Sequence, residues 1–251
     1  MSLAAAQYLE HVDAAALFRQ LKVPNPDALA RNVAHFTERE AAERDAIVLG
    51  YLGEDGARQV TEAIVEALLA AGAMNPAPAL LDIGAGSGFF TARVEEALRA
   101  RGLRPRMFAM DATPAMLRVL GAKGVRAVPF LGAFEDLEGS VREARKLQPL
   151  PELFDGAFST LALHHCSDPA LLLAGAARVL RFGAPLALVD LVEHDLERFR
   201  AMGDLHLGFP PERIAALALE HFHTARVEAL PGCRCTGDGG SVQLFLADLR
   251  R

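Results

Sequence analysis

The sequence predicts an α/β fold with a mostly parallel sheet, preceded by an all-helical N-terminal region. Apolar residues recur every three or four positions from about residue 3 to residue 71, and after Asn75-Pro76-Ala77-Pro78 short apolar runs alternate with helical stretches. The first of these runs passes into a helix through three glycines, within residues 80–90. We therefore divide the chain into an N-terminal helical region, residues 1–74, and an α/β domain, residues 75–251.

The helical spacing of the N-terminal region is seen in the pairs Leu17/Leu21 and Val33/Phe36 and in residues 64–69. Pro24 and Pro26 separate the first helix from the second. No strand-like alternation appears before residue 71, so we expect helices only.

Strands and helices alternate in the α/β domain, and this order predicts right-handed βαβ units with parallel strands. The expected strands are residues 79–83, 107–110, 125–128, 154–159 and 186–191, with helices at 91–100, 115–120 and 170–180. Two further runs, 221–230 and 241–249, are separated by residues 231–240, which are too few for a crossover helix. We expect these two runs to pair antiparallel.

The composition favours a globular protein and disfavours nucleic acid as a partner. Of the 251 residues, 51% are hydrophobic and 23% are charged, with a net charge of −6. Proteins that bind nucleic-acid phosphates usually carry a basic stripe instead. The odd number of cysteines fits a reducing compartment, and the run 67–81 contains two prolines and is too short to span a bilayer. We expect a cytoplasmic protein without membrane contact.

The loop Asp82-Ile83-Gly84-Ala85-Gly86-Ser87-Gly88 joins the first expected strand of the α/β domain to its first helix. In parallel sheets, ligands bind outside the carboxyl ends of the strands, where this turn brings backbone amides close to them. A Cβ atom would fill the space of the ligand, which explains the use of glycine. A tight turn alone needs one glycine, so three favour a ligand-binding loop.

The glycine spacing indicates the class of ligand. Dinucleotide-binding loops read G-x-G-x-x-G, whereas Gly88 follows Gly86 by two positions, and a phosphate-binding loop needs a Lys that is absent here. Asp111 ends the next expected strand, where a carboxylate can accept both ribose hydroxyls; a solvated aspartate is the alternative. We expect a nucleoside without a pyrophosphate, which disfavours an NAD-dependent oxidoreductase.

Several segments follow one another in a set order: the glycine loop, Asp111 followed by Met116-Leu117, Phe154-Asp155, Leu163-His164-His165 and Arg178-Val179-Leu180. Over roughly residues 75–250, this ordered set resembles the class I S-adenosylmethionine-dependent methyltransferases. A narrower resemblance, within residues 189–209, is to the methyltransferase half of fusions with ArsR-type regulators.

The resemblance implies a Rossmann-like, seven-stranded sheet of order 3-2-1-4-5-7-6, with strand 7 antiparallel, and S-adenosyl-L-methionine as cofactor. It also implies that Asp82 supports the loop or the amino end of the cofactor, and that Asp111 holds the ribose. The backbone expected to contact the methionine and ribose portions is that of Gly84, Ala85, Gly86, Gly88, Thr160 and Leu161.

The adenine side departs from the family pattern. Many relatives carry an aspartate that holds the adenine amino group, and alignment on Glu135-Asp136-Leu137 places Ala133 there. Glu135 or Asp136 substitutes for it, or the adenine is held by the Phe134 backbone and by packing from Ala112 and Met116. An aspartate at position 133 is then expected to tighten cofactor binding.

Polar residues follow the fourth and fifth expected strands, where the methyl acceptor should lie. His164 and His165 are the candidate catalytic residues, because a positioned base assists an acceptor that must lose a proton. Alignment of donor and acceptor without a base is the competing account. Adjacent residues at a strand end point to opposite sides, so at most one histidine should face the acceptor.

The remaining polar residues of this side are Asp190, Glu193, His194 and His206, and their spacing marks no metal site, so we expect no metal. Cys166, Cys233 and Cys235 resemble the thiol sets of arsenite methyltransferases, although a cysteine after a strand is more commonly a small buried hydrophobe.

We expect the protein to transfer a methyl group from S-adenosylmethionine to a small, partly apolar molecule. A cofactor-binding protein without turnover and an arsenite or thiol methyltransferase are the alternatives. The N-terminal helices are expected to form a lid over the acceptor; a packing bundle or a homodimer contact is the other role considered. The lid would include Tyr8, Phe18, Phe36 and Tyr51.

Overall fold

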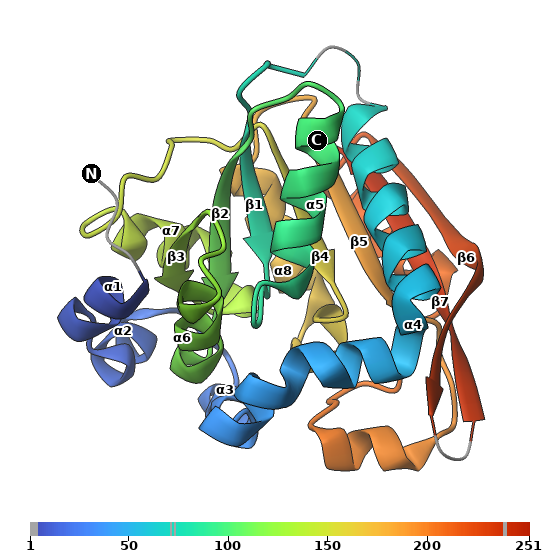
Figure 1. Ribbon diagram of the computed structural model, residues 1–251, viewed down its shortest axis with the longest axis horizontal. Helices are drawn as coiled ribbons and strands as arrows, with labels where there is room; N and C mark the ends of the chain where they lie inside the picture. The colour runs from blue at the N-terminus through green and yellow to red at the C-terminus, as the bar shows by residue number, and fades with distance from the viewer. Residues whose placement is uncertain (1–4, 71, 73, 238–239) are drawn as a thin grey trace.

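A computed structural model describes residues 5–70, 72, 74–237 and 240–251 of the chain (Figure 1). The N-terminal region is built from helices, as predicted, although its expected ends at Leu3 and Ala71 lie outside the described residues. Side-chain oxygens of Asp13, Asn25 and Thr37 cap the second to fourth helices by accepting backbone N–H bonds. The four helices are α1 (Ala5–His11), α2 (Ala14–Gln20), α3 (Pro26–His35) and α4 (Glu38–Leu69).

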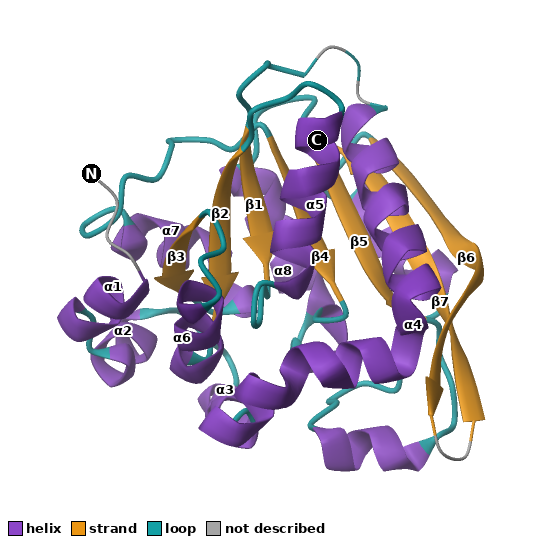
Figure 2. Ribbon diagram, viewed as in Figure 1, coloured by secondary structure: helices purple, strands orange, loops and turns teal. Residues whose placement is uncertain are grey.

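The α/β domain alternates strands and helices (Figure 2). Short 3₁₀ turns η1 (Phe134–Asp136), η2 (Leu163–His165) and η3 (Glu197–Met202) follow three of its strands. The longer elements are β1 (Ala79–Ile83), α5 (Phe89–Ala100), β2 (Arg106–Asp111), α6 (Pro114–Ala122), β3 (Ala127–Leu131), α7 (Leu137–Ala144), β4 (Gly156–Thr160), α8 (Pro169–Val179), β5 (Pro185–Leu191), α9 (Pro211–Leu219), β6 (Thr224–Gly237) and β7 (Gly240–Arg250).

The strand order β3-β2-β1-β4-β5-β7-β6 confirms the predicted sheet. Strands β1 to β5 pair in parallel, and β7 pairs antiparallel with both β5 and β6. All five parallel strands therefore place their carboxyl ends at one edge of the sheet, the lower edge in Figure 1.

Two strands, β3 and β6, differ most from the sequence prediction. β3 begins at Ala127 and runs to Leu131, because its pairing with β2 continues to Asp111. β6 continues through Pro231 and Gly232, which were expected to connect two strands. Its pairing register with β7 shifts between Ala229 and Arg234, as at a β-bulge. A bulge on an edge strand tolerates proline because its missing N–H would not be paired. The expected connector residues Asp238 and Gly239 lie outside the described residues.

The core lies on both faces of the sheet because successive strand residues point to opposite sides. Leu80 of β1 packs in a cluster with residues of α4 and α5, whereas its neighbour Leu81 packs in a cluster that includes α8. Figure 1 accordingly shows α4 and α5 on one face of the sheet and α8 on the other. Of the helices in the described ranges, none has the length and hydrophobicity to cross a membrane.

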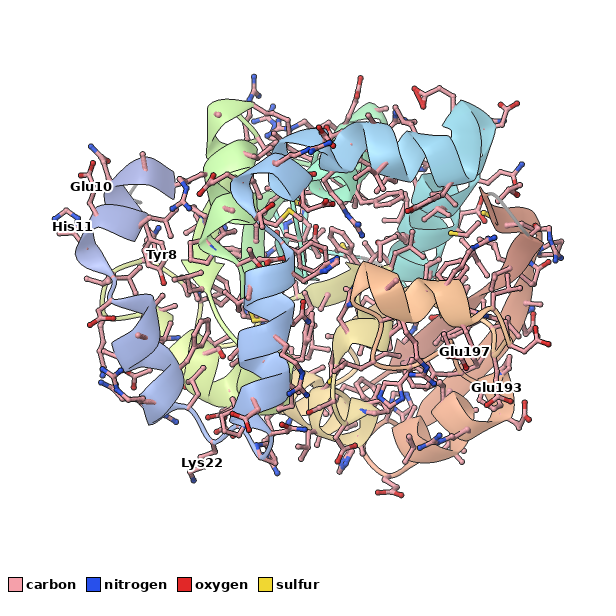
Figure 3. All side chains as sticks on the ribbon, turned by 90° about the horizontal axis from the view of Figure 1, so that it is seen from below. Tyr8, Glu10, His11, Lys22, Glu193 and Glu197 are labelled. Carbon is pink, nitrogen blue, oxygen red and sulfur yellow. The ribbon has the colours of Figure 1, made fainter. Side chains whose placement is uncertain are left out.

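Helix α1 packs beside the edge strand β3. The Leu131 N–H donates a hydrogen bond to the Tyr8 hydroxyl at 3.1 Å, and the Tyr8 side chain is buried. Figure 3 labels Tyr8 with its helix neighbours Glu10 and His11, which are exposed. The aromatic residue expected to line a lid thus belongs to the core.

Helix α4 changes direction at Gly53, which has φ 64° and ψ 171° inside an otherwise helical segment. This backbone region is populated almost only by glycine. The bend sends the first half of α4 across the carboxyl ends of the strands and the second half along the sheet beside α5 (Figure 1). Arg93 of α5 holds Glu54 just beyond the bend at 2.7 Å.

Substituting Gly53→Ala should lower the free energy of unfolding by about 1–3 kcal/mol, because alanine is strained in this conformation. Gly50→Ala is the matched control in the same helix. Its backbone is helical and a Cβ there meets nothing within 4 Å, so it should gain up to about 1 kcal/mol. Urea unfolding of both variants measures the difference, and equal stabilities would contradict a strained bend.

Candidate functional site

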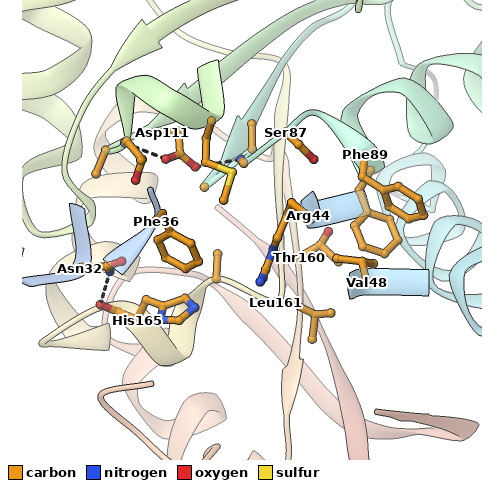
Figure 4. Close-up of a pocket in the computed structure, with 18 of the residues that line it drawn as sticks. Asn32, Phe36, Arg44, Val48, Ser87, Phe89, Asp111, Thr160, Leu161 and His165 are labelled. Carbon is orange, nitrogen blue, oxygen red and sulfur yellow. Dashed lines mark hydrogen bonds between the residues drawn. The ribbon is translucent and has the colours of Figure 1, made fainter. Parts of the chain in front are cut away.

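A pocket opens at the carboxyl ends of β1, β2 and β4 (Figure 4). The N-terminal helices α3 and α4 close its other side. The lining residues are Asn32, Phe36, Arg44, Val48, Gly84, Ala85, Gly86, Ser87, Phe89, Phe90, Asp111, Ala112, Thr113, Met116, Phe134, Thr160, Leu161, Ala162 and His165.

The glycine loop bends through left-handed backbone at all three glycines, with φ 77° at Gly84, 54° at Gly86 and 79° at Gly88. A Cβ on Gly86 would meet only the Met116 sulfur, at 4.0 Å, so it would occupy the pocket. A Cβ on Gly88 would instead come within 2.9 Å of Leu120. Gly86 therefore keeps ligand space open, and Gly88, which does not line the pocket, lets α5 begin close to α6.

Asp111 joins the loops that follow β1 and β2. Its two carboxylate oxygens accept backbone N–H bonds from Gly86 and Thr113, each at 2.8 Å. Burial raises the pKa of Asp111, and these two N–H donors act against that rise by stabilising the charged form. A carboxylate has about four acceptor positions, so further donors from a ligand can be bound.

Asp82 lies beneath the glycine loop rather than in the pocket. It is 2% exposed and accepts a hydrogen bond from the Thr91 hydroxyl at 2.6 Å. Burial raises its pKa to about 7, although the Thr91 bond favours the ionised form. The side chain fixes the first turn of α5 against β1 and titrates near neutral pH.

The residues expected around an adenine are only partly at the pocket. Phe134, Ala112 and Met116 line it, whereas Ala133 is fully buried and donates its N–H to the Ser140 hydroxyl at 3.0 Å. An aspartate at position 133 would therefore bury a carboxylate away from the pocket, and we now expect it to destabilise the fold.

Glu135 and Asp136, the two acidic residues considered for the adenine amino group, form hydrogen bonds outside the pocket. Glu135 accepts bonds from the Ser167 N–H and hydroxyl at 2.8 and 2.7 Å. Asp136 accepts from the Gly139 N–H at 3.0 Å and from the Lys22 N–H at 2.8 Å. Neither lines the pocket.

His164 and His165 lie on the 3₁₀ turn η2, not on a strand end, so their rings do not point to opposite sides of the sheet. The ring centroids are 4.2 Å apart. Of the two histidines, only His165 lines the pocket. This is consistent with the prediction that at most one of them faces the acceptor.

His164 lies between two carboxylates. Its Nδ1 lies 2.7 Å from Asp190 and its Nε2 lies 3.7 Å from Asp204. Burial alone would lower the pKa of His164, but the two aspartates outweigh it and the net pKa is raised. Asp190 also accepts the Leu163 N–H at 2.8 Å, so it fixes the turn after β4.

His165 is a buried, neutral imidazole at the pocket. Nδ1 lies 3.0 Å from the Gly203 carbonyl, and because a carbonyl only accepts, Nδ1 carries the proton and Nε2 is left unprotonated. Burial and the neighbouring His164 hold the pKa of His165 well below its ordinary value. Phe36 contacts its ring edge-on, and Asn32 donates to its backbone carbonyl at 3.3 Å.

One group of candidate metal ligands is found in the described part of the chain. Single ligand atoms of His164, His165 and Asp204 lie within 4.8 Å of one another. Nδ1 of His164 is already paired with Asp190, which leaves only Nε2 of that ring for a metal. Glu193, His194 and His206 line a separate cleft.

The three cysteines do not form one thiol site. Cys166 packs in one core cluster, whereas Cys233 and Cys235 pack in the other. Burial raises the pKa of Cys233 to about 11 and that of Cys235 to about 12, and it raises the pKa of Cys166 well above its ordinary value. Protonated, dispersed thiols do not suit arsenite binding.

The N-terminal helices supply pocket residues that the sequence did not single out. Of the four aromatic residues expected in a lid, only Phe36 lines the pocket. Asn32, Arg44 and Val48 accompany it, spaced along α3 and α4. Arg44 stands between Glu43 and Asp45 in a helix rich in charged residues, so no local pattern distinguishes it.

Comparison with known proteins places residues 81–188 in a family described as "Methyltransferase domain". The malonyl-[acyl-carrier protein] O-methyltransferase of Serratia marcescens is 31% identical over 174 residues, covering 68% of this chain and 60% of the relative. An uncharacterized methyltransferase of Mycobacterium tuberculosis is 36% identical over 110 residues, covering 44% of this chain and 38% of the relative. The chain thus spans less than two thirds of these relatives.

Solved methyltransferase structures share the fold. One, in complex with the Haloferax volcanii Trm112 activator, has a TM-score of 0.62 at 16% identity and covers 84% of this chain and 95% of that one. Human N-acetylserotonin methyltransferase in complex with S-adenosylmethionine has a TM-score of 0.55 at 17% identity, covering 96% of this chain and 61% of that one.

The titration of Asp82 predicts how stability depends on pH. Its folded pKa of about 7 lies above the ordinary value of 3.8, so the folded protein retains a proton that the unfolded chain loses. Relative to Asp82→Asn, the wild type should lose about 1.4 kcal/mol of stability per pH unit at most as pH rises from 4 to 7, and no more above 7.

Urea unfolding at pH 5, 6, 7 and 8 measures this difference without ligand. A second variant, Thr91→Val, removes the bond that favours the carboxylate and should move the end of the decline above pH 7. A constant difference between wild type and Asp82→Asn at all four pH values would contradict a raised pKa.

Proposed function

Because the chain belongs to the class I S-adenosylmethionine-dependent methyltransferases, we propose that it transfers the methyl group of S-adenosylmethionine to a small, partly apolar acceptor in the pocket below β1, β2 and β4. The observation that carries this proposal is the meeting of the glycine loop with Asp111 at the pocket wall, joined by the 2.8 Å bond from Gly86. The family cofactor supplies an electrophilic methyl group on sulfur.

The residues present fit this cofactor. Gly86 leaves the space that a Cβ would fill, and Asp111 keeps acceptor positions for ribose hydroxyls. Gly84 and Ala85 offer backbone along the same wall, and Thr160 and Leu161 close it from β4. In this proposal Asp82 and Gly88 act indirectly, by fixing the loop from beneath.

For the adenine we propose apolar packing rather than a carboxylate. Phe134, Ala112 and Met116 line the pocket, while Glu135 and Asp136 are engaged with other backbone and hydroxyl groups. In this proposal Ala133 supports the adenine side of the pocket indirectly, through the hydrogen bond from its N–H to the Ser140 hydroxyl. The ring would be recognised by shape and dispersion contacts.

On the acceptor side, His165 is the proposed catalytic residue and His164 is a positioning residue. The unprotonated Nε2 of His165 can accept a proton from an acceptor hydroxyl, and the Gly203 carbonyl fixes the ring in that tautomer. His164, clamped by Asp190 and Asp204, fixes the turn that carries His165. By name the Serratia relative methylates oxygen, and a base assists an oxygen acceptor where that oxygen carries a proton, as a phenol or enol does.

We also propose that residues 1–74 act as a cap on the domain of residues 75–251. Phe36, Arg44 and Val48 line the pocket opposite the strand ends, and Asp45 accepts a bond from Ser87 of the glycine loop at 2.5 Å. A cap of this kind excludes water from the transfer step.

Asp111→Asn should weaken binding of S-adenosylhomocysteine about 10–100-fold, because charge-assisted bonds to the ribose are lost. Asp136→Asn is the matched control, since Asp136 also accepts two backbone N–H bonds but lies outside the pocket. Calorimetry should show no change for the control and no NAD binding at millimolar concentration. Wild-type binding of NAD instead of the adenosyl ligand would contradict the proposal.

His165→Gln should lower turnover of a hydroxyl acceptor about 10²–10⁴-fold while cofactor affinity stays within a factor of a few. The acceptor is found first, by a screen of phenols, quinols, amines and thiols with labelled cofactor. Because the pKa of His165 is well below 6.5, the wild-type rate should be flat from pH 6.5 to 8.5. His194→Gln, in the separate cleft, is the control. A loss below tenfold, confined to the acceptor KM, would contradict a role as base.

A further inference from the structure

Three buried side chains with metal-binding atoms meet where the turn η2 contacts the loop after η3. One ligand atom each of His164, His165 and Asp204 lies within 4.8 Å of the other two. Nε2 of His164 is 3.7 Å from Oδ1 of Asp204, which is too long for a hydrogen bond. Two ligands of one tetrahedral zinc ion lie about 3.4 Å apart, because each is about 2.1 Å from the metal. The gap between these side chains is thus close to the width that a metal ion needs.

Each of the two imidazoles is oriented through one nitrogen and keeps the other. Nδ1 of His164 lies 2.7 Å from the Asp190 carboxylate, and Nδ1 of His165 lies 3.0 Å from the Gly203 carbonyl. Histidines that bind metals almost always make such a contact, because it fixes the tautomer whose other nitrogen binds the ion. Nε2 of both rings is therefore the atom available to a cation.

Asp204 supplies a carboxylate that the fold leaves partly unpaired. Its side chain is 3% exposed, and Oδ2 is buried without a hydrogen bond to any described residue. Asp190, on the other side of His164, is 1% exposed. Buried carboxylates are costly unless a cation compensates them. One divalent cation would compensate both, Asp204 as its ligand and Asp190 through the His164 ring.

The loop after η3 is already held against η2 by its backbone. The N–H groups of Leu205 and His206 both donate to the His164 carbonyl at 3.1 Å. Gly203 has φ 92°, and a Cβ there would come within 2.9 Å of the His35 ring, so glycine allows the loop to pass at this place. The two parts of the cluster are therefore placed next to each other before any ion binds.

We propose that His164, His165 and Asp204 bind a divalent transition-metal ion. Two imidazoles and one carboxylate suit ions such as Zn²⁺, Fe²⁺ and Mn²⁺, whereas Mg²⁺ and Ca²⁺ prefer oxygen ligands alone. Three protein ligands leave at least one coordination position for another molecule. His165 lines the pocket beside Phe36, so the open position lies on the acceptor side (Figure 4).

The ion would act on an acceptor that offers it a hydroxyl oxygen, a consequence that rests on the proposed function. Coordination lowers the pKa of a bound hydroxyl, whose proton then passes to water. The oxygen forms the new bond to the methyl carbon, and the electron pair of the broken carbon–sulfur bond stays on sulfur. His165 is a ligand in this state, and its role as a base belongs to the ion-free protein.

Calorimetry on chelator-treated protein, without cofactor or acceptor, tests the site with Zn²⁺ and Mg²⁺ as probes. Wild type should bind one Zn²⁺ with micromolar affinity or tighter, and Mg²⁺ at least about 100-fold more weakly. Asp204→Asn and His165→Gln should each weaken Zn²⁺ binding about 100-fold or more, and Asp190→Asn about 10–100-fold. His194→Gln, in the separate cleft, is the matched control and should leave the affinity unchanged.

Two further measurements cover variants that fail to fold by circular dichroism. Zn²⁺ should raise the Tm of wild type and of His194→Gln but not that of Asp204→Asn or His165→Gln. The visible spectrum of wild type with Co²⁺ needs no variant. The intense bands of a four- or five-coordinate ion support the site, and the weak bands of a six-coordinate, hydrated ion overturn it.

The inference is also overturned if wild type binds no Zn²⁺ below millimolar concentration, or if His194→Gln lowers the affinity as much as Asp204→Asn does. Binding of S-adenosylhomocysteine is measured separately on the same samples. Wild type that binds Zn²⁺ but not S-adenosylhomocysteine would contradict the proposed function and support the metal site, so the two failures are distinguishable.

Discussion

The carboxylate of Asp111 is the constraint on which the pocket depends. It accepts N–H bonds from Gly86, in the loop after β1, and from Thr113, in the loop after β2. These bonds exist because parallel pairing of β1 with β2 brings both loops to the same edge of the sheet. Asp190, at the end of β5, plays the same part for the turn after β4. Its carboxylate accepts the Leu163 N–H and bonds with Nδ1 of His164. The loops after β1 and β4 are thus each held by a carboxylate on a neighbouring strand.

The bend at Gly53 divides α4 into two halves that pack against different parts of the domain. Beyond the bend, the helix packs on the sheet beside α5 and contributes Ile64 and Leu68 to the core. Before the bend, it crosses the strand ends and is tied to the glycine loop by Asp45, which binds both Ser87 and Lys123. The core therefore anchors the segment that carries Arg44.

Burial sets the protonation states around the pocket. His164 and His165 are neighbours in sequence and have rings 4.2 Å apart, yet their pKa values move in opposite directions. Two aspartates surround His164, whereas His165 faces a carbonyl, a phenylalanine and the ring of His164. The His164 ring holds the turn in place through Asp190, and burial together with His164 lowers the pKa of the adjacent ring. Two neighbouring residues thus have different roles: His164 positions the turn, and His165 is the residue proposed to take part in the reaction.

The sequence by itself determined the architecture and the wall of the pocket formed by the α/β domain. The periodicity change near residue 75, the glycine spacing and Asp111 after β2 are local patterns, and local patterns are set by backbone conformation within a single strand, turn or helix. The antiparallel pairing at the C-terminus also followed from the shortness of its connector. In contrast, the continuation of β6 past Pro231 required the partner strand β7, which decides where a bulge is tolerated.

Only the tertiary structure decided which side chains meet across the pocket. Arg44 and Thr160 are far apart along the chain, and the bend at Gly53 brings the first to the second. The same holds for Asp204 beside His164, for Gly203 beside His165, and for Glu135, which the packing of η2 withdraws from the pocket. Long-range packing and burial set these contacts and the protonation states that follow from them. Neither quantity is encoded in the spacing of neighbouring residues, and for that reason the acceptor side stayed beyond the reach of the sequence.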